Sequence, residues 1–503
     1  MPRFRLIAAF VFAALGPLSA QPDPDERVAH LPEANPYRAV ALRWLSLPES
    51  DRNALSNWMS PDPSDENAPA PPDTAQKELA RSLAHDLAAA AKIGAIQSEL
   101  WPPKTDPKNP DNPFYILIPD VSVMLDLARI TNKVADTSPP ADAIQLYAAT
   151  ARFGRDIRSG ATLIQGLTGV AVEGIATSGA SRRLNAFSPQ ELESLSSSWR
   201  QLPAPPGIDH ALQSERNVFF IPLLERIILP GLLALQSEGV DSFDVPSRSG
   251  LSPDLKNLRL SGLIAAAGEQ LIHLENIATG HTFTVTNKKP AEGVKLIRFD
   301  AKAGRAWLRV NGAPAVLDLQ SKRFVSARDD IARLQKFLGI YMSNETPVKT
   351  PDWVRRALAH PDGPEGYALD LVEEYDRRMA AQVAGAQHNK KPEPSPDDVS
   401  ADPLLAMMMP TLGQVARRMN AASIQPVMFE AAIRHRLGQP GATPSDPWGQ
   451  PDAGKIPAPF IFEKTPDGGF VLRSAYEAQS DEPFTYKFGT PDAGVQRKPA
   501  ATQ

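Results

Sequence analysis

The sequence predicts a mainly α-helical, multi-domain protein, with helical hairpins or a bundle, a small antiparallel β meander and a C-terminal unit that joins a helix to a β-hairpin. Three observations support this prediction. Apolar residues recur at helical spacing from about residue 74, and they alternate as in strands between residues 255 and 320. The 50 prolines among 503 residues, about twice the usual share of roughly 5%, cluster in polar stretches that indicate linkers.

Hydrophobic residues make up 42% of the chain, which is enough to form a core in several domains. The predicted segments follow one another along the chain. They are a signal peptide (1–20), an N-terminal segment and linker (21–73), an all-α domain (74–240), a small antiparallel β domain (255–320), a helical segment (321–385), a second linker (386–400), a helix with a β-hairpin (401–485) and a polar tail expected to be disordered (486–503).

The first 20 residues have the pattern of a secretory signal peptide. Arg3 and Arg5 precede an apolar run, and small residues follow up to Ala20. The run is shorter than the roughly 20 residues that span a bilayer, so cleavage near Ala20 and a periplasmic or secreted location are expected. An uncleaved anchor is the alternative.

Charge and cysteine content exclude several classes of function. Without Arg3 and Arg5 the formal charge falls from −5 to −7, which does not favour nucleic acid or an anionic membrane as a partner. The chain has no cysteine, which excludes disulfides, thiol catalysis and thiolate zinc sites.

Helix signals are clear in the predicted all-α domain. Asp73 and Gln76 have capping-box spacing before an apolar stripe, Pro140 can start another helix, and Ser188 with Glu191 repeats the capping-box spacing. Between these helices lies a glycine-rich stretch, residues 160–180. Glycine inside a helix costs about 1 kcal/mol relative to alanine, so this stretch is expected to be a buried helix closely approached by a neighbour.

The most apolar internal run covers residues 217–235. Pro222, Glu225, Arg226 and Pro230 interrupt it too often for a membrane span. A buried helix is therefore expected, and a face that binds a membrane surface or a partner is the alternative.

Alternating apolar residues and turn signals predict the β domain and the C-terminal hairpin. Phe283 and Val285 alternate with threonines, and "DAKAG" and "NG" separate further short strands. Near the C-terminus, "TPDGG" separates two apolar runs, and the helix before them is expected to be interrupted at Pro410 and Pro426. Trp448 is expected to anchor this hairpin by packing.

No residue pattern identifies a reaction. The sequence therefore predicts no catalytic, cofactor-binding or metal-binding residues. The eight histidines are scattered, without the i, i+4 spacing of a helical zinc pair, and there is no Gly-x-Ser-x-Gly motif. Carboxylate pairs such as Glu373–Glu374 lie in charged helix segments and indicate a solvated face.

The stretch "SDPWGQPDAGKIPAPFIFEKTPDGGFVLRS", together with the preceding helix, resembles the C-terminal sheet of major pseudopilins of type II secretion. The pseudopilin start is missing, because Arg3 precedes Phe4 and Ala8 occupies the position of the glutamate. The resemblance would imply a calcium site, but "SAY" at 474–476 lacks the expected glycine and only Asp481 and Glu482 follow. Loss of calcium binding is therefore expected, since calcium takes six to eight oxygen ligands.

Two further regions resemble known proteins. The segment "LRLSGLIAAAGEQLIHLEN" to "GAPAVLDL" resembles the periplasmic β-domain of type II secretion clamp proteins and type IV pilus lipoproteins. The helical region 110–240, with "GATLIQGLTGVAVEG" and the later "SPQELESL", resembles uncharacterised exported proteins of planctomycete- and verrucomicrobium-type bacteria.

These observations favour an exported, non-enzymatic scaffold or binding protein associated with a secretion or pilus-type assembly. Its expected partners are proteins of the cell envelope, with no nucleic acid and no transmembrane helix once the signal peptide is removed. The alternative is an exported hydrolase whose carboxylates assemble only in the fold.

Overall fold

The computed structural model of the chain describes residues 24–28, 31–59, 72–102, 104–105, 116–117, 121–160, 162–238, 253–266, 269–286, 288–300, 305–311, 313–319, 322–325, 327–341, 351–387, 402, 404–405, 412–439, 444–447, 460–477, 483–490 and 494–495. The predicted signal peptide, most of both predicted linkers, Pro410, Trp448, Asp481 and Glu482 lie outside the described residues.

The fold is mainly α-helical with small antiparallel β modules, as the sequence predicts. Helices of the N-terminal half form one body around a large hydrophobic core. They are α2 (Pro24–Val28), α3 (Arg38–Leu45), α4 (Glu49–Met59), α5 (Thr74–Ile93), α6 (Val121–Thr137), α7 (Pro140–Arg158), α8 (Leu163–Arg182) and α9 (Pro189–Arg200).

Local capping signals fix where two of these helices start. The side chain of Asp73 accepts a hydrogen bond from the backbone N–H of Gln76, and the Gln76 side chain accepts from the backbone N–H of Asp73. Ser188 and Glu191 form the same box at α9. Both predicted capping boxes are confirmed, because each depends only on residues three apart.

Helices α3 and α4, which belong to the predicted N-terminal segment, pack on the rest of the helical body. Val40, Trp44 and Leu55 from α3 and α4 are buried in the core of the helical body. Val40 and Trp44 are four residues apart, which places them on one face of α3, and this face packs into the core.

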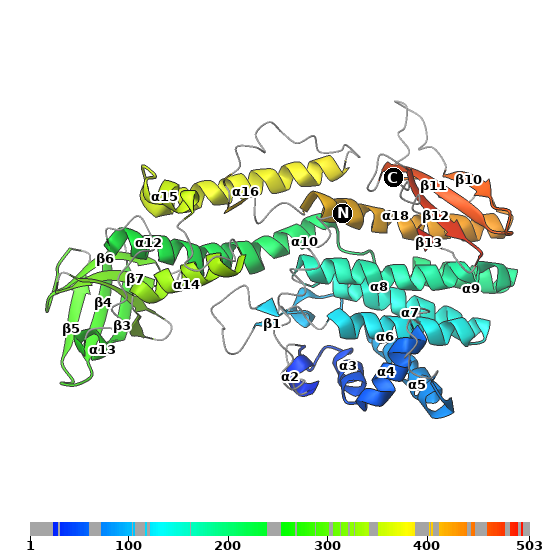
Figure 1. Cartoon of the computed structure of the whole chain (residues 1–503), viewed down its shortest axis with the longest axis horizontal. Coiled ribbons are helices and arrows are strands. Elements are labelled where there is room, and N and C mark those ends of the chain that lie inside the picture. The colour runs from blue at the N-terminus through cyan, green and yellow to red at the C-terminus, as the bar shows by residue number, and fades with distance from the viewer. Residues whose placement is uncertain are drawn as a thin grey trace.

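A second helical layer begins with one long helix that carries the chain away from the first body (Figure 1). It consists of α10 (Ile208–Glu215), a π-helical stretch over Arg216–Phe220, α11 (Ile221–Leu223), a second π-helical stretch over Leu224–Ile228 and α12 (Leu229–Glu238).

The two π-helical stretches explain how this helix tolerates its prolines. A proline ring clashes with the carbonyl four residues earlier. For Pro222 that residue is Val218, and for Pro230 it is Arg226, and each lies within a π-helical stretch. The wider turn makes room for the ring, so the prolines do not end the helix.

In the described residues, Asp209–Gln236 is long and apolar enough to cross a membrane by length and composition, with a mean hydropathy of 2.0 in its most apolar window. However, 67% of that window is buried inside the protein. The residues form a second core with α14 (Ala327–Tyr341), α15 (Asp352–Leu358) and α16 (Gly363–Gln387). The predicted buried helix is therefore confirmed.

The middle of the chain forms a seven-stranded antiparallel sheet with the order β5-β4-β3-β9-β8-β7-β6. The strands are β3 (Leu258–Ala266), β4 (Glu269–Asn276), β5 (Thr282–Thr286), β6 (Val294–Asp300), β7 (Arg305–Val310), β8 (Ala313–Asp318) and β9 (Arg323–Val325). The sheet differs from the predicted simple meander, because β9 returns to pair with β3 and joins two meanders.

This sheet curls strongly. Its edge strands, β5 and β6, are consecutive in the chain, whereas a flat sheet of this size would hold its edges about 29 Å apart at about 4.8 Å per strand. Glu292 and Gly293 turn the connection with φ values of 49° and 72°, and β6 then lies beside β5. One face encloses a third core, while Trp307 and Val316 face the second core.

The C-terminal part returns to the first helical body. It comprises α18 (Leu412–Arg436) and a four-stranded sheet in the order β10-β11-β12-β13, with β10 (Ile461–Lys464), β11 (Phe470–Glu477), β12 (Pro483–Phe488) and β13 (Gly494–Val495). The predicted hairpin is β10 and β11, paired antiparallel.

Two C-terminal predictions are wrong. Pro426 lies inside α18 and does not interrupt it, because burial of Met428 and Phe429 outweighs the cost of about 3 kcal/mol. The predicted tail, 486–503, contains the end of β12 and all of β13. The signal missed is the alternation of Phe484, Tyr486 and Phe488, whose side chains are all buried.

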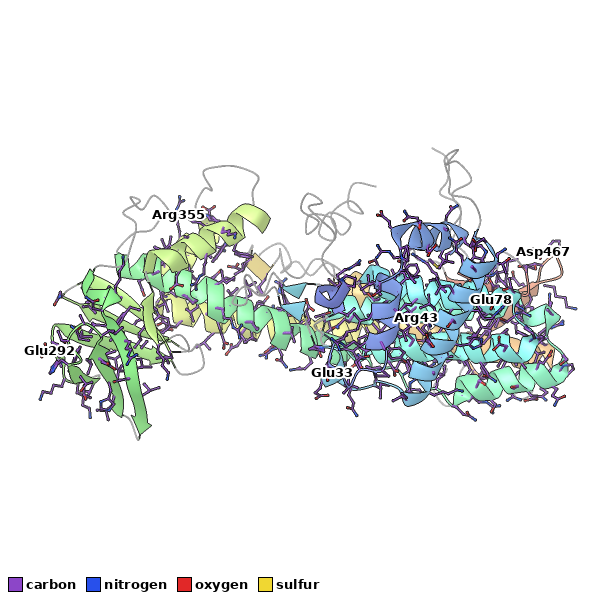
Figure 2. The ribbon with its side chains drawn as sticks, turned by 90° about the horizontal axis from the view of Figure 1, so that it is seen from below. Glu33, Arg43, Glu78, Glu292, Arg355 and Asp467 are labelled. Carbon is purple, nitrogen blue, oxygen red and sulfur yellow. The ribbon has the colours of Figure 1, made fainter. Side chains whose placement is uncertain are left out.

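The molecule is elongated. The seven-stranded sheet lies at one end and the first helical body with the four-stranded sheet at the other, and the α10–α12 helix runs between them (Figure 1). Figure 2 shows Glu292 near one end of the long axis and Asp467 near the other.

Candidate functional site

Helices α7 and α8 pack with their backbones in direct contact. A Cβ atom on Gly154 of α7 would lie 2.7 Å from the backbone nitrogen of Glu173 and 2.7 Å from the carbonyl oxygen of Gly169. Glycine at both positions lets the two backbones touch. The expectation that residues 160–180 form a buried, closely approached helix is confirmed.

Close approach brings a buried ionic cluster between the two helices. Arg155 Nε donates to Glu173 Oε1 at 2.9 Å, and Arg158 donates to Glu173 Oε2 at 3.2 Å. The same guanidinium groups also donate to the carbonyls of Pro203 and Pro206. Burial lowers the pKa of Arg158, and Glu173 opposes that shift. The cluster ties α7, α8 and the loop after α9 together.

Asp156 joins the N-terminal segment to the same helix. Its carboxylate, fully buried, accepts hydrogen bonds from Tyr37 Oη at 2.7 Å, the backbone nitrogen of Ala95 at 2.9 Å and Arg152 Nε at 2.8 Å. Burial raises the pKa of Asp156, and the donors act against that increase. All of the donors are used for structural ties, so this carboxylate does not resemble a poised catalytic base.

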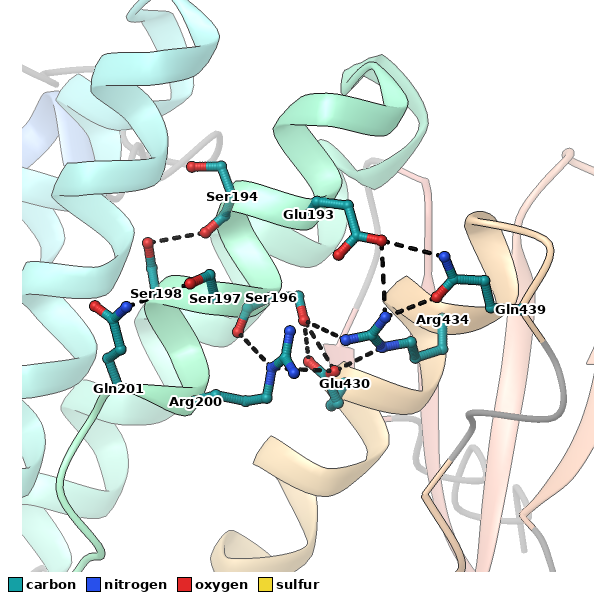
Figure 3. A network of polar contacts seen from close by, with 10 residues as sticks. All are labelled: Glu193, Ser194, Ser196, Ser197, Ser198, Arg200, Gln201, Glu430, Arg434 and Gln439. Atoms are coloured by element: carbon teal, nitrogen blue, oxygen red, sulfur yellow. Dashed lines mark hydrogen bonds and ion pairs between the residues drawn. The ribbon is translucent and has the colours of Figure 1, made fainter.

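A third polar cluster connects α9 to α18 (Figure 3). The hydroxyl of Ser196 donates to Glu430 at 2.9 Å, and Arg434 Nε donates to the same carboxylate at 2.9 Å. Gln439 and Glu193 extend the cluster at the surface. Ser196 has no histidine beside it in this cluster, so the geometry indicates a helix–helix tie and not an activated nucleophile.

A pocket of about 370 Å³ lies where these elements meet the C-terminal sheet, and we name it the α8–β12 pocket. It is lined by Gly174, Ser178 and Arg182 of α8, by Asn132 of α6, by Gln425 of α18 and by Tyr486 of β12. This volume is at the lower end of the range of roughly 300–1,000 Å³ for small-molecule sites.

Arg182 supplies the charge at the pocket wall. Its guanidinium donates to Asp136 at 2.9 Å, and Tyr147 Oη donates to the other oxygen of that carboxylate at 2.6 Å. Arg183 lies on the same side and donates to the carbonyl of Ser138 at 3.0 Å. Of the Arg182–Asp136 pair, only the guanidinium lines the pocket, so the charged group at its wall is a cation.

Tyr486 supplies an unusual polar group. Its hydroxyl and that of Ser181 are buried without a hydrogen bond of good geometry. Burial raises the pKa of Tyr486 to about 12, while the nearby hydroxyls of Ser181 and Ser178 lower it. The hydroxyl therefore stays protonated at neutral pH and can donate a hydrogen bond.

The histidines in the described part of the chain lie apart from one another, each with a local partner. His210 lies 3.3 Å from the Ser159 carbonyl, and His273 lies 2.8 Å from Thr284 Oγ1. No group of three or more potential metal ligands occurs among the described residues. Glu373 is exposed and Glu374 accepts from Arg377 and Arg378, which agrees with a charged helix face.

The C-terminal hairpin is held by Asp446 within the described residues. Asp446 accepts from Ser474 Oγ at 2.9 Å and from the backbone nitrogen of Ala475 at 2.6 Å, and it is 1% exposed. Asp446 thereby ties a loop to β11. The expected packing role of Trp448 and the expected loss of calcium binding at Asp481 and Glu482 concern residues outside this description.

Comparison of the chain with protein-family models, curated proteins and solved structures gives no match. The resemblances to pseudopilins, to secretion clamp proteins and to exported helical proteins therefore stay hypotheses.

Sequence reasoning named none of the residues that line the α8–β12 pocket as a site. Asn132, Gln425 and Tyr486 come from three separate parts of the chain, and none belongs to a motif. The one usable signal was the glycine content of α8, because Gly174 leaves the space that the pocket occupies. A Cβ atom there would meet only Gln425 Oε1, at 3.8 Å.

Proposed function

We propose that this chain is an exported, non-enzymatic scaffold or binding protein, and that its partners are proteins of a secretion or pilus-type assembly in the cell envelope. The observation that carries the proposal is the placement of two β-sheets at opposite ends of an elongated helical framework (Figure 1). Such a layout offers two separated surfaces, as a protein that holds partners requires. The sequence resemblances to secretion proteins fall on these two sheets.

The ionic clusters give independent support. Glu173, Asp156 and Glu430 are each bonded to arginine and to other groups of the framework. None of the residues lining the described pocket is a carboxylate. The hydrolase alternative needs two carboxylates that converge on a cavity, so the described residues favour binding over hydrolysis.

Export predicts a specific mature N-terminus. We expect Edman sequencing or mass spectrometry of the protein from its native host to start at or near Gln21. A mature chain that retains Met1 would contradict cleavage and would favour the uncleaved anchor.

Site-specific crosslinking tests the partners. Because the chain has no cysteine, a single cysteine can carry a photocrosslinker at Leu263 of β3, which is 39% exposed, or at Ile461 of β10, which is 60% exposed. We expect both variants to crosslink secretion or pilus components in intact envelopes. Glu78→Cys, at an exposed position of α5, is the matched control and should not crosslink these components.

The result has two contradicting outcomes. Equal crosslinking from Glu78→Cys would indicate nonspecific capture. Products that contain no secretion or pilus protein would reject the proposed assembly, although they would leave a binding role for other partners.

A further inference from the structure

We propose that the α8–β12 pocket binds a small monocarboxylate with a short apolar chain. This inference goes beyond the scaffold function and does not depend on it, because the pocket lies in the helical body and not on the exposed faces of the two sheets. It rests on three features of the pocket: its charge, its buried hydroxyl groups and its open space.

The polar groups of the pocket favour an acceptor with negative charge. Arg182 brings a guanidinium to the wall, and the neutral side chains of Gln425 and Tyr486 can donate hydrogen bonds. Asp136 pairs with Arg182, but only Arg182 of this pair lines the pocket, so a guanidinium is the charged group that a ligand would meet first. A carboxylate accepts hydrogen bonds at both oxygens and gains most from a charged donor.

The buried hydroxyl of Tyr486 makes no hydrogen bond of good geometry within the protein. A buried polar group without a hydrogen bond costs stability, and such groups are rare in folded proteins. The Tyr486 side chain is 2% exposed and lines the pocket, next to the hydroxyls of Ser178 and Ser181. A ligand oxygen in the pocket would offer this hydroxyl an acceptor of good geometry, which the neighbouring serine hydroxyls do not supply.

The remaining wall suits an apolar chain. Ala171 and Ile175 add apolar surface beside Gly174, where no side chain fills the space. The length of the apolar part is limited by the volume of about 370 Å³. These dimensions fit an acid of about four to eight carbons at the small end of the known range of ligand sites.

Binding to purified full-length protein tests the inference with defined probes. We expect hexanoate to bind with a dissociation constant on the order of 1 mM or tighter, measured by calorimetry and by ligand-observed NMR. Hexanol and hexylamine should bind at least about tenfold more weakly, a difference of about 1.4 kcal/mol.

Two variants locate the site. Gly174→Leu fills the pocket and should abolish hexanoate binding, while Ser194→Leu, which adds the same side chain to an exposed helix position, should leave it unchanged. Tyr486→Phe should weaken hexanoate binding about five- to tenfold, yet keep or raise the melting temperature, because it removes a buried hydroxyl that makes no hydrogen bond of good geometry.

Three outcomes would overturn the inference. The first is hexanoate binding that survives Gly174→Leu. The second is hexylamine binding as tightly as hexanoate or more tightly. The third is no binding of any probe at a concentration about tenfold above the expected dissociation constant. If Gly174→Leu fails to fold, Tyr486→Phe provides the test, and an unchanged affinity of that variant for hexanoate would reject the site. Crosslinking in envelopes is a separate result, so failure here leaves the scaffold proposal standing.

Discussion

Glu173→Gln should destabilise the protein by about 3–5 kcal/mol, measured by urea unfolding followed by circular dichroism. The carboxylate is 4% exposed and is shared by Arg155 and Arg158, whose side chains are 6% and 2% exposed. Removing its charge leaves two buried guanidinium groups without a counter-ion, which is the costly way to break a buried ion pair.

The control and a second variant separate charge from packing. Glu78→Gln breaks an exposed pair with Arg81 and should change stability by less than about 1 kcal/mol. Adding Arg158→Met to Glu173→Gln removes one of the two uncompensated charges and should recover part of the loss. A loss that the second change leaves unaltered would show that Glu173 acts through packing, against the electrostatic explanation.

Gly169→Ala should destabilise the protein by about 2–3 kcal/mol or more, or prevent folding. A Cβ atom at this position would overlap the carbonyl oxygen of Gly154, and it would lie 2.5 Å from Arg158 Cγ and 2.8 Å from the Arg158 backbone nitrogen. Most of these atoms belong to the facing backbone, so α7 and α8 would have to separate. Urea unfolding again provides the measurement.

The same helix supplies a matched control. Gly174→Ala places its Cβ atom no closer than 3.8 Å to any neighbour, and alanine favours a helix over glycine by up to about 1 kcal/mol. This variant should therefore be as stable as the parent or more stable. Equal losses from both substitutions would mean that the close approach of α7 and α8 does not explain the glycines.

Much of the local structure could be predicted from the sequence. Asp73 and Ser188 mark helix starts, and the glycines of 160–180 indicate a closely approached helix, because these signals act over a few residues. Alternation of apolar residues also located strands between 255 and 320. Periodicity identifies an apolar face reliably where the face belongs to one continuous element.

The ionic clusters and the pocket could not be predicted in the same way. Arg155 and Glu173 look like ordinary helix-surface charges until the α7–α8 contact buries them. Pro222 and Pro230 look like helix breakers until the π-helical stretches accommodate them within a buried helix. In both cases burial in the fold outweighs the local preference.

The sequence by itself determined the mainly helical class, the starts of several helices and the positions of most central strands. Only the tertiary structure decided that α18 and β12 return to α8, some 250 to 300 residues later in the chain, and thereby assembled the pocket from Asn132, Gln425 and Tyr486. The physical reason is that the hydrophobic effect is non-directional. An apolar face in the sequence therefore predicts that a surface is buried, but it does not predict which distant element covers that surface.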